Sequence, residues 1–123
     1  NQLRGGAVWG IGLSALERHL YDPQNGIPAS TGFWQSKIPT ILDTPPNIDT
    51  GWVDLPDPEN PVGARGIGEP SMGAVSAALN AAISDALGGH MFDAAPVTTD
   101  MIVNHIAGIS EDATPLAQNN FRG

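Results

Sequence analysis

Proline and glycine occur so often in this sequence that regular secondary structure can extend over only a few stretches. Eleven prolines and fifteen glycines are many for 123 residues, because proline removes a backbone donor and glycine costs entropy inside helices and strands. Only residues 5–20, 70–87 and 98–108 have patterns that favour helices. So few elements bury little surface, and we expect the chain to be a segment of a larger protein that completes its core against other polypeptide.

The clearest expected helix begins at Pro70, a residue that suits the first turn of a helix. Apolar residues recur at three- and four-residue spacing from Met72 to Ala86, and Gly88-Gly89 follows as a stop signal. Many of the residues between are alanines. Their small side chains give the helix a slim surface, which favours close packing against neighbours on several sides.

A second helix is expected over residues 5–20, which are apolar on almost every side until Glu17, Arg18 and His19. Such a pattern is typical of a buried helix. Its four glycines cost roughly 1 kcal/mol each in a helix interior. We therefore expect another backbone or a ligand to approach closely there, and plain helix–helix packing accounts for most of these positions.

The segments between the helices are expected to be mostly irregular. Residues 21–26 carry Asp-Pro and Asn-Gly turn signals, and residues 27–46 are irregular but apolar enough to lie across a surface. Alternation at residues 48–53 predicts a short strand, and residues 92–97 are a candidate for a further extended segment. These elements predict an α+β fold with two main helices, one short strand and long irregular loops.

The charge and composition of the chain limit its partners. A net charge of −8 argues against nucleic acid or an anionic membrane surface, whose phosphates it would repel. The sequence has no cysteine, and so offers no disulfide, iron–sulfur ligand or zinc-thiolate site. The sequence has no run of roughly 18 apolar residues, the length that spans a bilayer. The cellular compartment is left undetermined. The histidines at 19, 90 and 105 lack metal-ligand spacing, so we expect no metal ligand in this chain.

The stretch from Gly63 to Gly73 is the candidate for chemistry. Its glycines let the backbone turn sharply and come close to another group, and Glu69 lies between them and the helix that begins at Pro70. The helix dipole alone favours a carboxylate there, so the local pattern leaves a catalytic and a purely structural role open. A phosphate-binding role is weaker, because the third glycine of a dinucleotide motif is missing and Glu69 would repel a phosphate.

At Gly66-Ile67-Gly68-Glu69-Pro70 the sequence resembles the C-terminal end of the molybdenum-binding (large) subunit of the xanthine dehydrogenase and aldehyde oxidoreductase family. Three further stretches agree in order. Residues 2–12 resemble the glutamine-led, glycine-rich helix start of that family, residues 21–40 its following loop and Ile-Pro segment, and residues 57–70 its approach to the active-site glutamate. One short motif would be weak evidence, whereas agreement in register along residues 1–106 is specific.

The resemblance implies a hydroxylase that oxidises an aldehyde or an N-heterocyclic or aromatic substrate, with water as the oxygen source and molybdenum bound by a pterin cofactor. It implies Glu69 as the active-site base and Gln2, Ile67 and Gly68 as cofactor-binding residues. The implied partners are the remainder of the molybdenum-binding subunit, an iron–sulfur subunit and a flavin subunit with FAD. On this reading the chain is active only together with them.

The resemblance also divides the chain. Residues 1–108 are expected to be the C-terminal part of the molybdenum-cofactor-binding domain rather than an independent domain, and the polar residues 109–123 a C-terminal arm that can be disordered. A different class of function stays open beside the enzyme. The chain could be a non-catalytic interaction or assembly module that keeps this end of the fold as a binding surface.

Overall fold

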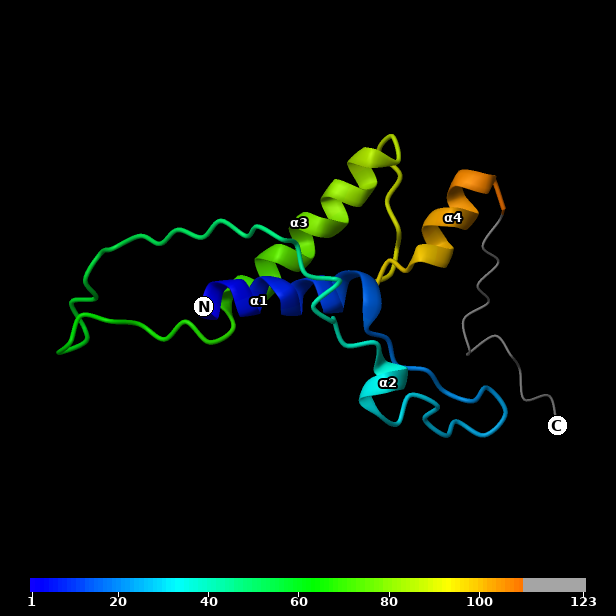
Figure 1. Cartoon of the computed structure of the whole chain (residues 1–123), viewed down its shortest axis with the longest axis horizontal. Coiled ribbons are helices and arrows are strands. Elements are labelled where there is room, and N and C mark those ends of the chain that lie inside the picture. Colours follow the sequence, from blue (N-terminus) through cyan, green and yellow to red (C-terminus); the bar gives the residue numbers. More distant parts are fainter. Residues whose placement is uncertain (110–123) are drawn as a thin grey trace.

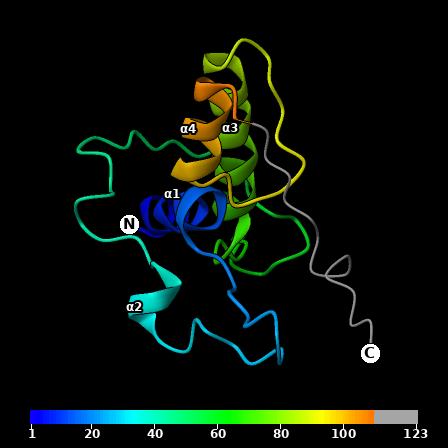
Figure 2. The same ribbon diagram turned by 90° about the vertical axis from the view of Figure 1, so that its right-hand side faces the viewer.

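The computed structural model describes residues 1–109, which form helices joined by long irregular segments (Figure 1). α1 and the π-helical turn η1 that continues it pack across α3, which Figure 2 shows upright with α1 nearly end-on. The long segment between α2 and α3 extends away from this crossing (Figure 1). The elements are α1 (Gln2–Ile11), η1 (Gly12–Leu16), α2 (Phe33–Ser36), α3 (Pro70–Ala86) and α4 (Thr99–Ala107).

α1 and η1 form the helix expected over residues 5–20, with both ends shifted. The helix begins at Gln2 and finishes in a π turn that ends at Leu16. The N–H of Glu17 donates to the carbonyl of Gly12 at 2.8 Å, the five-residue spacing of a π turn. Glu17 itself has extended backbone, so the charged residues expected at the helix end lie beyond it.

The helix expected from Pro70 is confirmed as α3, and the shorter one expected over residues 98–108 is confirmed as α4. Gly88 and Gly89 follow α3 at positive φ, 71° and 92°. Gly108 ends α4 in the left-handed region, with φ 67°. Glycine adopts this region without the steric cost of a Cβ atom, which is why these positions stop the helices.

The short strand expected at residues 48–53 does not form. The backbone runs as a stretched, irregular segment there, and it pairs with no other part of residues 1–109 (Figure 1). Residues 92–97 contain bends and no strand. A strand needs the N–H and C=O groups of a neighbour, and the described part of the chain supplies none beside residues 48–53. The described residues are therefore helices and loops alone, which corrects the expected α+β class for this part of the molecule.

One antiparallel bridge, between Tyr21 and Pro28, is the β pairing of the described residues. It encloses the turn expected at residues 21–26. Inside the turn, the carboxylate of Asp22 accepts a hydrogen bond from the N–H of Gln24 at 2.8 Å, and the Asn25 side chain accepts one from the N–H of Ile27 at 2.9 Å. These bonds are the local turn chemistry that Asp and Asn provide.

The core of the described residues is small. Val97, 3% exposed, is their one buried hydrophobic side chain, while Phe33, Trp34 and Leu42 are each at least 85% exposed. Isolated folded domains do not leave so many large apolar side chains in water. The packing therefore agrees with the expectation that other polypeptide completes this core.

Within residues 1–109, no helix combines the length and the apolar character that crossing a bilayer requires. The expected C-terminal arm, residues 109–123, lies outside the described residues except for Ile109, which is exposed.

Candidate functional site

Glu69 lies where the glycine-rich segment meets α3. It occupies the N-cap position, with φ −111° and ψ −11°, and Pro70 follows it in the first turn. The Glu69 carbonyl accepts a hydrogen bond from the N–H of Met72 at 3.0 Å, which starts the helix. The Glu69 residue is exposed, and its side chain makes no capping bond. Its carboxylate therefore has no partner among residues 1–109 and lies at the positive end of the helix dipole, where an anion is favoured.

Gln2 lies beside this junction. Its side-chain Nε2 donates a hydrogen bond to the Gly68 carbonyl at 2.9 Å, across 66 positions of sequence. Ile67 and Glu69 flank Gly68 in the chain. The bond thus brings together the four residues expected from the sequence to form the site, and we refer to Gln2, Ile67, Gly68 and Glu69 as the site cluster.

The glycines of α1 determine how closely α1 approaches the first turns of α3. A Cβ atom at Gly10 would lie 2.7 Å from the carbonyl oxygen of Met72 and 2.9 Å from the Cβ of Val75. A Cβ at Gly6 would collide with the Ser71 hydroxyl. Only glycine allows the two backbones to come this close. The expected close approach of another backbone is confirmed at Gly10, whereas at Gly6 the close neighbour is the Ser71 side chain.

The other two glycines of this segment differ from each other. A Cβ at Gly12 would lie 2.9 Å from both Cγ and Cδ of Pro39, so the Ile-Pro segment packs directly on η1. A Cβ at Gly5 would meet nothing within 4 Å among the described residues. Gly5 is therefore not required by packing within this part of the chain.

Ser14 joins three segments at the centre of the fold and was not singled out by the sequence. It is completely buried. Its hydroxyl lies 2.6 Å from the Gly10 carbonyl and 2.9 Å from the hydroxyl of Ser76 on α3, and its carbonyl accepts a hydrogen bond from the N–H of Val97 at 2.7 Å. The only sign of this role in the sequence is that Ser14 is a small polar residue in an otherwise apolar helix. Paired in this way, Ser14 fixes α1 against α3 without leaving a buried polar group unsatisfied.

The backbone of the site cluster is open to groups outside this chain. A Cβ atom at Gly66 or at Gly68 would meet nothing within 4 Å, and neither glycine has positive φ. Neither packing nor conformation within the described residues therefore explains why glycine stands there. Ile67, between them, is 43% exposed. Glycines in such positions let a ligand or another segment approach the backbone closely.

A compact loop of residues 57–65 precedes the glycine-rich segment. Arg65 Nε donates to the carboxylate of Asp57 at 2.6 Å, and the Asn60 side chain donates to the Ala64 carbonyl at 2.8 Å. The Arg65 guanidinium lowers the pKa of the Asp57 carboxyl below its ordinary value, and a hydrogen bond from the backbone N–H of Glu59 adds to this effect. These bonds give the loop its own internal order, a few residues before the site cluster in the sequence.

The structure brings together two histidines that are 15 positions apart. The rings of His90 and His105 stack with centroids 3.8 Å apart and planes 18° apart, and Phe92 lies edge-on to His90 at 4.7 Å. His19 lies elsewhere, beside Tyr21. Residues 1–109 contain no group of three or more His, Cys, Asp or Glu side chains arranged to hold a metal ion.

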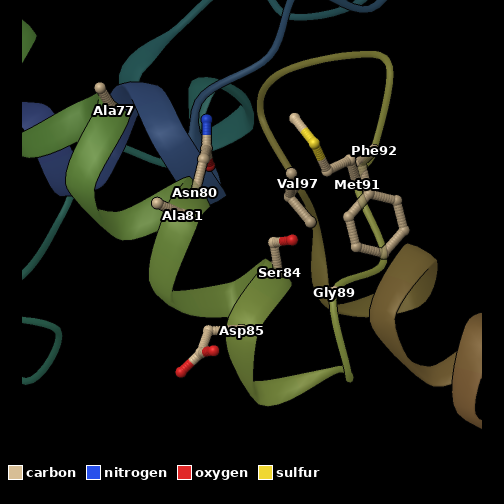
Figure 3. Close-up of a pocket in the computed structure, with 9 residues that line it drawn as sticks. All are labelled: Ala77, Asn80, Ala81, Ser84, Asp85, Gly89, Met91, Phe92 and Val97. Atoms are coloured by element: carbon tan, nitrogen blue, oxygen red, sulfur yellow. The ribbon is translucent and has the colours of Figure 1, made fainter.

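A hollow of about 450 Å³ lies between α3 and the segment that follows it (Figure 3). Asn80 and Ser84 of α3 line one side, and Met91, Phe92 and Val97 line the other. The Oδ1 atom of Asn80 is buried and has no hydrogen-bond partner within residues 1–109. None of the four residues of the site cluster lines this hollow, so it is separate from the candidate site.

Comparison with known proteins places this arrangement in a family. Residues 1–45 match the molybdopterin cofactor-binding domain family. Over 112 residues the chain is 37% identical to the 6-hydroxypseudooxynicotine dehydrogenase complex subunit gamma of Paenarthrobacter nicotinovorans, covering 89% of this chain and 14% of that protein. Over 110 residues it is 28% identical to the xanthine dehydrogenase molybdenum-binding subunit of Escherichia coli O157:H7, covering 88% and 14%.

A solved structure has the same fold. The crystal structure of quinoline 2-oxidoreductase from Pseudomonas putida 86 matches with a TM-score of 0.78 and 34% identity, over 89% of this chain and 14% of that one. The chain thus spans about one seventh of the length of these relatives. It belongs, as a segment, to the molybdenum-binding subunits of the xanthine dehydrogenase and aldehyde oxidoreductase family.

Proposed function

We propose that this chain is the part of a molybdenum hydroxylase that contributes the active-site base, Glu69. The hydrogen bond from Gln2 to the Gly68 carbonyl carries the proposal. It joins the start of α1 to the start of α3 and so gathers the site cluster around one exposed carboxylate. A positioned base near a reacting group is what proton transfer requires.

The residues of the site cluster fit a pterin cofactor. Gln2 has an exposed carboxamide that offers a ligand its oxygen as an acceptor and the one N–H that does not bond the Gly68 carbonyl. Gly66 and Gly68 leave the backbone beside Ile67 uncovered, with no Cβ atom in the way. Gln2 and the backbone of Ile67 and Gly68 would hold the cofactor, and the remainder of the subunit would provide the rest of its contacts.

The proposed reaction replaces a C–H bond of the substrate by C–OH. The oxygen comes from water, and two electrons and two protons leave. When bound, the molybdenum cofactor supplies a Lewis acid that acidifies water and an acceptor for the two electrons. Glu69 accepts the proton of that water at a carboxylate oxygen. Acidified water is a strong enough acid for a carboxylate to serve as its base.

The names of the relatives support a nitrogen-containing ring or an aldehyde as the substrate class. The solved structure is a quinoline 2-oxidoreductase, and another relative is an aldehyde oxidoreductase. One relative is the gamma subunit of a complex, which supports partner subunits. We assign the iron–sulfur clusters and FAD, through which the electrons leave, to those partners.

The replacement Glu69→Gln in the assembled enzyme tests the proposal. Glutamine keeps the shape and exposure of the side chain but cannot accept the proton. We expect molybdenum content and thermal stability to stay near those of the wild type, while turnover falls by about 10²–10⁴-fold. Glu59→Gln is the matched control, because Glu59 is an exposed carboxylate on the preceding loop and should leave turnover unchanged.

Near-normal turnover in Glu69→Gln would remove the catalytic assignment. The chain would then be better explained as a non-catalytic interaction or assembly module of the same fold, for which the exposed apolar side chains such as Trp34 would form the binding surface.

A further inference from the structure

Residues 48–55 have a backbone without partners. None of their N–H or C=O groups makes a hydrogen bond with another part of residues 1–109, backbone or side chain. Pro46 and Pro56 bracket the segment. Proline is tolerated at the ends of strands and not within paired ones, so the unpaired run has the length and borders of a strand.

From residue 48 to residue 52 the sequence alternates as in a strand that is covered on one face. Ile48, Thr50 and Trp52 share one face, and Ile48 lines a hollow of about 570 Å³ against Arg4 and Val8 of α1. Trp52, further along, is 76% exposed. Alternation over residues 48–52 is typical of a half-buried strand. On this face Ile48 therefore lies beside α1, while Trp52 is exposed to solvent.

An unpaired strand with large apolar side chains is an open edge, and proteins pair, cover or charge such edges. Val53 and Leu55, which would lie on the opposite face of such a strand, are 82% and 78% exposed. The material that could pair with the segment is the rest of the subunit, because the chain corresponds to only 14% of the length of its relatives.

We propose that residues 48–55 form a β-strand in the assembled enzyme, paired with a strand from the part of the molybdenum-binding subunit that lies outside this chain. The proposal rests on the proposed function only in assigning the chain to such a subunit. Pairing supplies the missing hydrogen bonds and covers Trp52. It also anchors the loop of residues 57–65, which starts directly after the strand and leads to Glu69.

Amide hydrogen exchange in the assembled enzyme tests the pairing. If one edge of the strand is paired, alternate amides from 48 to 55 exchange on the order of 10²-fold more slowly than unstructured amides; if both edges are paired, all of them do. Exchange at unstructured rates along the whole segment would overturn the proposal.

Two neighbouring proline variants provide a matched pair. The N–H groups of Thr50 and Gly51 point to opposite edges of a strand, and stretched backbone accepts proline without a steric conflict. If the strand is paired on one edge, only one of the variants Thr50→Pro and Gly51→Pro should lower the yield of assembled, molybdenum-containing enzyme several-fold. If it is paired on both edges, both variants should lower this yield. Two variants with wild-type yield would contradict the strand.

Photo-cross-linking identifies the partner. A photo-reactive residue in place of Val53 should form cross-links within the same molybdenum-binding subunit. Cross-links to another subunit or to a second copy would overturn the assignment of the partner. These readouts are independent of turnover in Glu69→Gln, so failure of the strand and failure of the proposed base can be told apart.

Discussion

Replacing Gly10 by alanine should disturb the site cluster although Gly10 belongs to neither the cluster nor the glycine-rich loop. The added Cβ would lie 2.7 Å from the Met72 carbonyl oxygen and 2.9 Å from the Cβ of Val75. Carbon atoms in contact prefer roughly 3.5–4.0 Å. α1 and the first turns of α3 must therefore separate by about 0.5–1 Å, judged from that preferred spacing.

Two consequences of this separation can be measured in the assembled enzyme. Strain from overpacking costs about 1–3 kcal/mol, and alanine returns about 0.5–1 kcal/mol of helix propensity, so we expect a net loss of roughly 1–2 kcal/mol in the free energy of unfolding. The Gln2–Gly68 bond, now 2.9 Å, would be stretched beyond hydrogen-bond distance. A displacement of this size at a positioned base lowers turnover by about 10²-fold.

Gly5→Ala is the control for this experiment, because it makes the same change on the same helix where a Cβ meets nothing within 4 Å. It should leave turnover unchanged and stabilise α1 by up to about 1 kcal/mol through helix propensity. Steady-state kinetics and thermal unfolding of the two variants are the assays. A Gly10→Ala enzyme with wild-type turnover and stability would refute the idea that the glycine contact positions the site.

Two further predictions concern the site cluster and the loop before it. Gln2→Ala removes the bond to Gly68, worth about 0.5–1.5 kcal/mol, and should lower the molybdenum content of the enzyme. Gln24→Ala, on an exposed turn, is the control and should not lower it. Equal molybdenum content in the two variants would show that Gln2 does not belong to the cofactor site. Because Arg65 lowers the pKa of Asp57, their pairing stabilises the loop at neutral pH and down to the unfolded-state pKa of about 3.9, and this stability is lost as the pH falls through the lowered folded-state value. Asp57→Asn should abolish that acid-dependent loss. The measurement is amide hydrogen exchange of the loop residues, corrected for the effect of pH on the intrinsic exchange rate. If both proteins lose protection in the same way as the pH falls, another group is responsible.

The helices that could be predicted from the sequence are those with local signals at their ends. Pro70 and the Gly88-Gly89 pair delimit α3, and Gly108 ends α4, because each acts through its own backbone geometry. The π turn at η1 was not predicted, since apolar periodicity does not distinguish it from the α-helix it continues. The strand expected at residues 48–53 is not formed for another reason: its signal is local, but a strand needs a pairing partner, and residues 1–109 provide none.

In the candidate site, too, some features could be predicted from the sequence and others could not. The position of Glu69 at a helix N-terminus follows from the glycines and the proline around it. Its proximity to Gln2 could not be derived from spacing, because a hydrogen bond across 66 positions depends on how two helices pack; only the family resemblance pointed to both residues. The role of Ser14 gave no clear signal, because a serine becomes a central contact only once η1, α3 and Val97 meet around it.

The bond between Gln2 and Gly68 also has a consequence for the order of folding. It closes a loop of 66 positions, most of which have no regular structure of their own. Closing such a loop costs roughly 4 kcal/mol of chain entropy, from (3/2)RT ln n, and contacts this distant in sequence form slowly. During synthesis Gln2 leaves the ribosome long before α3 exists, so α1 must wait for its partner helix. The site cluster can therefore assemble only after α3 has formed and packed against α1.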